Sequence, residues 1–138
     1  MKSVYGLLLM GSVFLCGCSQ APKLCLVTGT VTVKGKPAEG AIINFHSDDS
    51  TIETASAVAN SEGSFKPISQ SLAGMRAGHY KVTVIWPDPS KKPTEVQIMM
   101  GTADVGPDLL KGKYSLKSST SLTVDITDST TTLPPFEL

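Results

Sequence analysis

Apolar and polar residues alternate with a period of two along much of the chain after residue 25. In residues 26–33, one face carries Val27, Gly29, Val31 and Val33, and threonines occupy the other face. This period is typical of a strand with one buried face, because successive side chains point to opposite sides of a sheet. The pattern therefore predicts a half-buried antiparallel strand.

The same alternation recurs in other short segments. It is clearest in residues 79–86, where Tyr80, Val82, Val84 and Trp86 share a face and are expected in the core. The other expected strands lie at residues 41–46, 54–59, 64–66 and 122–127, and the chain closes with an apolar pair around a charge at 136–138. Short strands separated by turns, without a convincing amphipathic helix, predict an all-β sandwich.

Turn-forming residues separate these segments. Glycine accepts a positive φ, proline presets φ, and asparagine bonds to the backbone two residues on. We therefore expect turn roles for Gly35, Pro37, Gly40, Asn60, Gly63 and Gly78.

Residues 87–119 form a long connection that contains four prolines. A connection of this length without regular structure is typical of a functional or a mobile segment. It is our first candidate for a binding surface. The alternative is a surface insertion with a short edge strand at residues 96–100.

The length and the net charge of the chain disfavour some classes of function. The 138 residues suit one domain, and 12 basic and 12 acidic side chains give zero formal charge. Such a balance disfavours nucleic-acid binding, which normally requires a basic patch.

The N-terminus begins with Lys2 and continues with an apolar run at residues 4–15. A helix needs about 20 apolar residues to cross a bilayer, so this run is too short to span one. A charged start, a short apolar centre and small residues predict a secretory signal peptide. The run ends in the sequence Leu15-Cys16-Gly17-Cys18.

This sequence resembles the lipobox of bacterial lipoproteins. The resemblance implies that the thiol of Cys18 receives a diacylglycerol and that cleavage falls between Gly17 and Cys18. Leu15 and Cys16 complete the motif. Cys16 is a rival anchor, but the bulky Phe14 and Leu15 before it disfavour cleavage there. The alternative is a plain signal peptide with incidental cysteines.

The resemblance divides the chain into a signal peptide at 1–17, an acylated cysteine with a short tether at 18–25, and a domain at 26–138. Residues 19–23 reach roughly 17 Å at most, so we expect the domain close to the leaflet. The expected location is the bacterial cell envelope, with export and lipid anchoring by palmitate-type chains. Ser19 replaces the aspartate of an inner-membrane retention motif, which slightly favours the outer membrane.

The strand and turn segments, in order, resemble the carboxypeptidase regulatory-like (transthyretin-like) domain of small bacterial lipoproteins. Residues 29–45 resemble the family's opening, G-x-V-x-x-x-G-x-P-x-x-G-A-x-V-x-F. Residues 59–65 resemble T-D-x-x-G-x-F, with Asn60 where aspartate is commoner. Residues 77–84 resemble P-G-x-Y-x-V-x-V. Residues 110–138 resemble the ending, I-P-x-K-Y, then L-x-x-x-V and F-x-L.

The resemblance implies a seven-stranded Greek-key, Ig-like β-sandwich with no cofactor and no catalysis. We therefore expect a membrane-anchored lipoprotein that holds lipid through Cys18 and contacts an envelope protein or a glycan, with no nucleic-acid partner. The alternative is a periplasmic module that binds a small ligand with the loop at 87–119.

Candidate metal ligands are sparse. His46 and His79 lie in different segments without a Cys or Glu partner at metal-ligand spacing. Asp48-Asp49 and the pair Asn60 and Glu62 lack the alternating oxygen ligands of a Ca²⁺ loop. We expect no metal site.

Catalytic motifs are also missing, since the chain has neither G-x-S-x-G nor H-E-x-x-H. Cys25 would remain as the only free thiol, either as a small buried residue or in a pair between molecules. Five lysines make the connection mildly basic, which suits a solvated loop or contact with anionic lipid: Lys91, Lys92, Lys111, Lys113 and Lys117.

Overall fold

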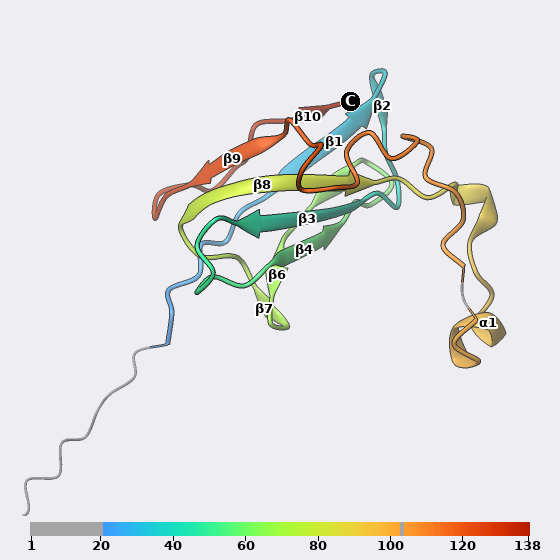
Figure 1. The fold of residues 1–138 in the computed structure, drawn as a ribbon, viewed down its shortest axis with the longest axis horizontal. Helices are drawn as coiled ribbons and strands as arrows, with labels where there is room; N and C mark the ends of the chain where they lie inside the picture. Colours follow the sequence, from blue (N-terminus) through green and yellow to red (C-terminus); the bar gives the residue numbers. More distant parts are fainter. Residues whose placement is uncertain (1–20, 103) are drawn as a thin grey trace, which may run out of the picture.

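The computed structural model describes residues 21–102 and 104–138, which form an all-β domain with two sheets (Figure 1). The smaller sheet has the order β10-β1-β2, with β5 also paired to β1, and the larger sheet has the order β7-β6-β4-β3-β8-β9. The strands are β1 (Gly29–Val33), β2 (Lys36–Pro37), β3 (Ile42–Ser47), β4 (Ala55–Val58), β5 (Ser64–Phe65), β6 (Ile68–Ser69), β7 (Leu72–Ala73), β8 (Gly78–Ile85), β9 (Thr123–Ile126) and β10 (Phe136–Glu137). A 3₁₀ turn, η1 (Pro89–Lys91), and a helix, α1 (Glu95–Met99), lie between β8 and β9.

The long strands lie where the alternation predicts them. β3 and β8 pair along six residues in antiparallel register, from Ile42 opposite Ile85 to Ser47 opposite Tyr80. β1 pairs antiparallel with β2 and β5 and parallel with β10, whereas the sequence pattern predicted an antiparallel strand only. The two-residue strands β2, β6 and β7 were not predicted, because two residues are too few to show a period.

Aromatic rings join the two sheets in the core. The Phe65 ring of the small sheet lies 6.1 Å from the Phe45 ring of β3, centroid to centroid, and stacks on Phe136 at 6.0 Å. Phe45 also meets Tyr80 of β8 edge-on at 6.5 Å. A Cβ on Gly29 would stand 2.3 Å from the Phe65 ring, so this strand position has room only for glycine. The buried face of β1 is therefore shaped around Phe65.

The first hairpin turns at Lys34 and Gly35, whose φ values are both positive, 50° and 76°. Positive φ at both central residues is typical of a type I′ turn, which suits the twist of paired strands. The prediction of a turn role for Pro37 is wrong, because Pro37 lies in β2 opposite Thr32. β2 is a sheet edge, where a missing backbone N–H is tolerated.

The turn between β4 and β5 is built around Asn60, whose Oδ1 accepts the backbone N–H groups of Glu62 at 3.0 Å and Ser64 at 2.9 Å. Gly63 has a φ of 73°, and a Cβ there would approach the carbonyl oxygen of Val31 to 2.5 Å. Gly40 also has a positive φ, 80°. The turn role predicted for Gly78 is wrong, because Gly78 begins β8 opposite Ile126.

Candidate functional site

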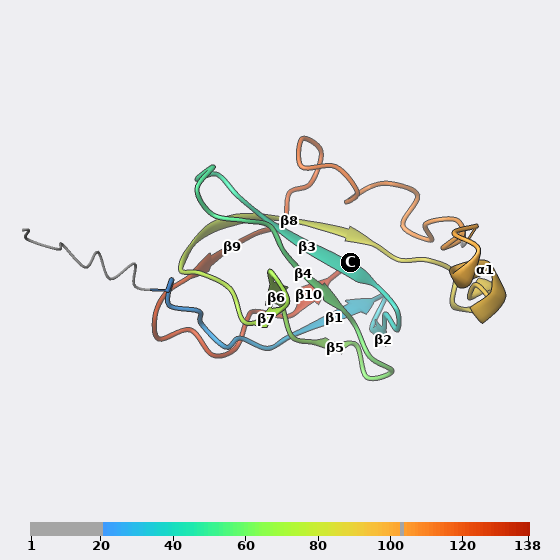
Figure 2. The same cartoon turned by 90° about the horizontal axis from the view of Figure 1, so that it is seen from below.

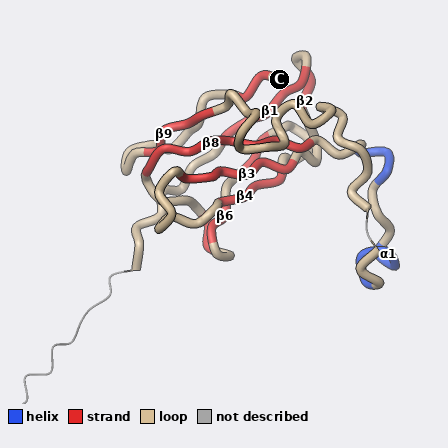
Figure 3. Tube along the Cα trace, in the orientation of Figure 1, coloured by secondary structure: helices blue, strands red, loops and turns tan. Residues whose placement is uncertain are grey.

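Residues 87–109 form an arm that projects beyond one end of the sheets (Figure 1). Within the described residues, helical structure is confined to this arm (Figure 3). The edge strand considered for residues 96–100 is wrong, because α1 occupies Glu95–Met99. The connection from 87 to 119 is therefore partly structured, contrary to the expected irregular loop.

Local residues specify α1 at both ends. The backbone N–H of Gln97 donates to Thr94 Oγ1 at 3.3 Å, and the Thr94 N–H donates to Gln97 Oε1 at 2.8 Å. This reciprocal pair is a capping box. At the other end, Gly101 has a φ of 67°, and the N–H of Thr102 donates to the Gln97 carbonyl at 2.9 Å, as in a Schellman motif. The T-x-x-Q spacing followed by glycine could have predicted this helix.

The carboxylate of Asp108 holds the base of the arm. Its Oδ1 accepts the backbone N–H groups of Trp86 at 2.9 Å and Leu110 at 3.0 Å, and its Oδ2 accepts that of Gly112 at 2.9 Å. The N–H of Leu109 donates to the Trp86 carbonyl at 2.8 Å. These bonds tie the outgoing chain to the returning chain.

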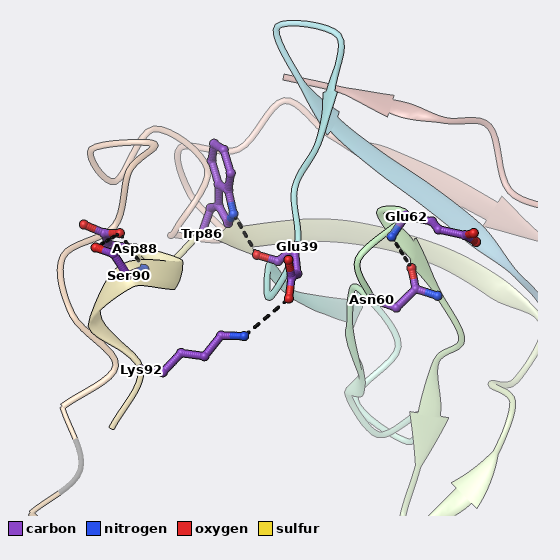
Figure 4. Close-up of polar contacts among 7 residues, drawn as sticks. All are labelled: Glu39, Asn60, Glu62, Trp86, Asp88, Ser90 and Lys92. Carbon is purple, nitrogen blue, oxygen red and sulfur yellow. Dashed lines mark hydrogen bonds and ion pairs between the residues drawn. The ribbon is translucent and has the colours of Figure 1, made fainter. Parts of the chain in front are cut away.

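A second set of contacts braces the arm against the turn before β3 (Figure 4). The indole N–H of Trp86 donates to the Glu39 carbonyl at 3.0 Å, and Lys92 Nζ lies 3.3 Å from Glu39 Oε1. Trp86 is only partly buried, against the expectation of a core residue, because it follows the end of β8. Asp88 caps η1 by accepting the N–H and hydroxyl of Ser90, and these bonds lower the pKa of Asp88.

The end of the arm exposes apolar side chains. The exposed fractions are 62% for Val96, 87% for Met99, 72% for Met100 and 51% for Val105. We call these four residues the arm tip. Contiguous exposed apolar residues are typical of surfaces that contact a partner or a membrane.

Two hollows accompany these features. One, of about 360 Å³, lies within the arm and is lined by Lys91, Lys92, Pro93, Gln97, Asp104, Gly106 and Pro107. The other, of about 540 Å³, lies between the small sheet and the end of β4. Its lining combines the apolar side chains of Val58, Phe65 and Leu133 with the polar side chains of Thr28, Thr30, Asn60, Ser64, Lys66 and Thr132. Hydroxyl and amide groups donate and accept hydrogen bonds, which suits a hydroxyl-rich ligand. The sequence analysis missed the second hollow, because segments far apart in the chain form it.

The histidines lie on strand surfaces. His79 Nδ1 is 2.6 Å from Asp125 Oδ1 on the neighbouring strand, with both side chains exposed. His46 Nε2 is 3.0 Å from Thr83 Oγ1. Asp49 accepts both the N–H and the hydroxyl of Thr51, in a local turn. Across residues 21–102 and 104–138, no three His, Cys, Asp or Glu side chains gather as metal ligands would.

His46 provides a test of local electrostatics. Burial, and then the charge of Lys117, lower its pKa below the ordinary value of 6.5. Because the unfolded chain binds this proton more readily, the contribution of His46 to stability is complete above pH 6.5 and falls as the pH drops. We expect Lys117→Met to raise the pKa of His46, measured by NMR titration of the imidazole protons. Lys111→Met is the control, and an equal shift in both variants would contradict this assignment.

The proposed anchor lies outside the described residues, as do Leu15, Cys16 and Gly17. Cys25 is a buried free thiol whose backbone pairs with Met75. None of the described helices is both long and apolar enough to cross a membrane. The chain matches no known family model, no curated protein and no solved structure.

Proposed function

We propose that the chain is a bacterial lipoprotein that is anchored through acylated Cys18 and acts by contact, without catalysis. The observation that carries this proposal is the lipobox-like Leu15-Cys16-Gly17-Cys18 directly after a short apolar run. Cleavage before Cys18 would remove residues 1–17 as a signal peptide. The first β-bridge of the described chain is at Cys25, so only a short tether separates the anchor from the domain.

The domain is proposed to be a seven-stranded Greek-key sandwich of the carboxypeptidase regulatory-like type. Support comes from the strands that fall on the motif segments, namely β1 and β3 at the opening, β5 after Gly63, β8 after Ala77, and β9 and β10 at the end. The turn at Asn60 also has the side-chain bonds that such a hairpin needs.

The contact partner is proposed to be an envelope protein or a glycan. The hollow at the small sheet supports a glycan, because it places hydroxyl and amide groups beside apolar side chains and sugars need many hydrogen-bond partners. The second candidate function is a periplasmic module that binds a small ligand, which the hollow within the arm favours. A saturable thermal shift with a metabolite, lost when the arm is shortened, would select this second function.

The anchor is tested by expressing the chain in a Gram-negative host with labelled palmitate. We expect the wild type to be labelled and to sediment with membranes, and Cys18→Ser to be unlabelled and released from membranes, because a single thiol carries the diacylglycerol. Cys16→Ser is the matched control and should behave like the wild type. Continued labelling of Cys18→Ser, or loss of label in Cys16→Ser alone, would contradict the proposal.

A further inference from the structure

Three parts of the molecule lie on one side of the sheets in Figure 1: the start of the described chain, the β6–β7 hairpin and α1. Figure 2, which views the molecule from that side, shows the three spread along the long axis, with the start of the chain at one end and α1 at the other. β10 and the β1–β2 turn lie on the opposite side in Figure 1. The molecule therefore has one side that carries both α1 of the arm and the start of the described chain, three residues after Cys18 in the sequence.

The elements on this side expose apolar side chains, and the β6–β7 hairpin does so on both of its faces, because Ile68 pairs with Ala73 and Leu72 pairs with Ser69. Leu72 in β7 is 60% exposed and Ile68 in β6 is 52% exposed, and the arm tip adds Met99 at 87% and Met100 at 72%. A soluble protein normally exposes such residues singly, so a set on projecting elements of one side indicates a contact surface.

The arm tip also suits an environment poor in water. At the helix ends, the backbone N–H groups of Thr94, Gln97 and Thr102 find partners within the segment, through the Thr94–Gln97 capping box and the bond from Thr102 to the Gln97 carbonyl. Backbone groups left without partners are costly in lipid, so a self-capped turn enters an interface more readily than an irregular loop. Methionine side chains adapt to an irregular apolar surrounding.

The short tether favours a lipid surface as the partner of this side of the domain. Residues 19–23 reach roughly 17 Å at most, so an acyl chain on Cys18 would draw the side from which the chain leaves towards the leaflet. Tethering turns a weak second contact into an intramolecular one with a high effective concentration. A protein on the same side would have to fit between the domain and the bilayer.

We propose that the arm tip and the β6–β7 hairpin rest in the leaflet that receives the acylated Cys18, so that the domain lies with its long axis along the membrane. This inference depends on the proposed lipid anchor. The contact is proposed to be apolar and not ionic, because the charged residues beside the tip, Glu95 and Asp104, are acidic and would not attract anionic headgroups. Binding through the lysines of the arm is a different arrangement, and Lys92 is already paired with Glu39.

The test uses the full acylated chain in vesicles of phosphatidylethanolamine and phosphatidylglycerol that contain brominated lipid. Met99→Trp places a fluorophore in the arm tip, and Lys36→Trp places one on β2, on the opposite side. Trp86 contributes equally to both variants and is subtracted with the wild type. We expect bromine to quench the added fluorescence of Met99→Trp by at least about half and that of Lys36→Trp hardly at all, because a tip in the interface sits about 5–10 Å into the headgroup region.

Two further outcomes separate the inference from the anchor. Equal, weak quenching of both variants on protein that sediments with the vesicles would overturn the inference and leave the anchor intact. If acylated protein does not form or does not sediment, both fail. Crosslinking of an unquenched tip to a protein in cells would assign this surface to a protein partner instead.

Salt and charge test the apolar character of the contact. Raising NaCl should leave the quenching unchanged, because apolar burial is not screened. Replacing Met100 with Asp in the Met99→Trp chain should reduce the quenching at least about twofold, because a carboxylate resists the interface. Loss of quenching at high salt, or no effect of the aspartate, would contradict the proposal.

Discussion

Phe65→Ala should lower the free energy of unfolding by about 3–5 kcal/mol, the usual cost of truncating a buried phenylalanine. Phe65 is only 2% exposed, and its ring contacts Phe45 of the large sheet and Phe136 of the small one. Truncation would leave a cavity between the sheets. Since domains are stable by about 5–15 kcal/mol, this single change should remove a large share. Urea denaturation followed by circular dichroism measures it.

A substitution at Gly29 tests the same packing around the Phe65 ring. Gly29→Ala should cost about 1–3 kcal/mol, as overpacking does, because the ring 2.3 Å from the new Cβ is held between two other rings. In the Phe65→Ala background the same change should cost little, since the space is empty. Lys66→Ala, at the exposed neighbour, should stay within about 0.5 kcal/mol. Additive costs for Gly29→Ala and Phe65→Ala would contradict the packing described here.

Asp108→Ala should detach the base of the arm at a cost of about 2–4 kcal/mol, because three backbone N–H groups lose a charged acceptor. The loss should be local. Hydrogen exchange should accelerate around Trp86 and residues 109–112, while the centre of β3 remains protected. The arm would then separate from the sheets without unfolding them.

Two further variants test whether this result is specific to the carboxylate of Asp108. Asp108→Asn keeps one acceptor oxygen and should fall between the wild type and Asp108→Ala. Asp104→Ala removes an exposed carboxylate that accepts the Gly106 N–H at 3.0 Å, and it should leave the arm base unchanged. Uniform acceleration across both sheets, or equal effects at the two aspartates, would contradict the role of Asp108.

The strands were predictable because each buries one face along several residues. Val31 in β1 and Val82 in β8 are fully buried, so the period of two is visible in the sequence. The edge strands of two residues have no such period. The parallel pairing of β1 with β10 could not be predicted either, since β10 lies far along the chain.

The arm was harder to predict for a different reason. Its prolines suggested an irregular loop and its short apolar run an edge strand, while its order comes from individual bonds at Thr94, Gln97 and Asp108. Only the capping box and the glycine that follows α1 form a local sequence pattern. Asp108 bonds to residues at both ends of the arm, and the hollow at the small sheet joins three separate segments, so neither leaves a pattern in adjacent residues.

The short edge strands of the two sheets affect whether neighbouring copies of the protein aggregate. Sheet margins with free backbone groups recruit other chains and so promote aggregation. Here β7 is two residues long, β2 contains Pro37, and β9 carries the charged Asp125. If Cys18 is acylated as proposed, copies of the domain are confined to the plane of a membrane, where they meet one another far more often than in solution. Blunt margins would let many copies share such a plane without joining edge to edge.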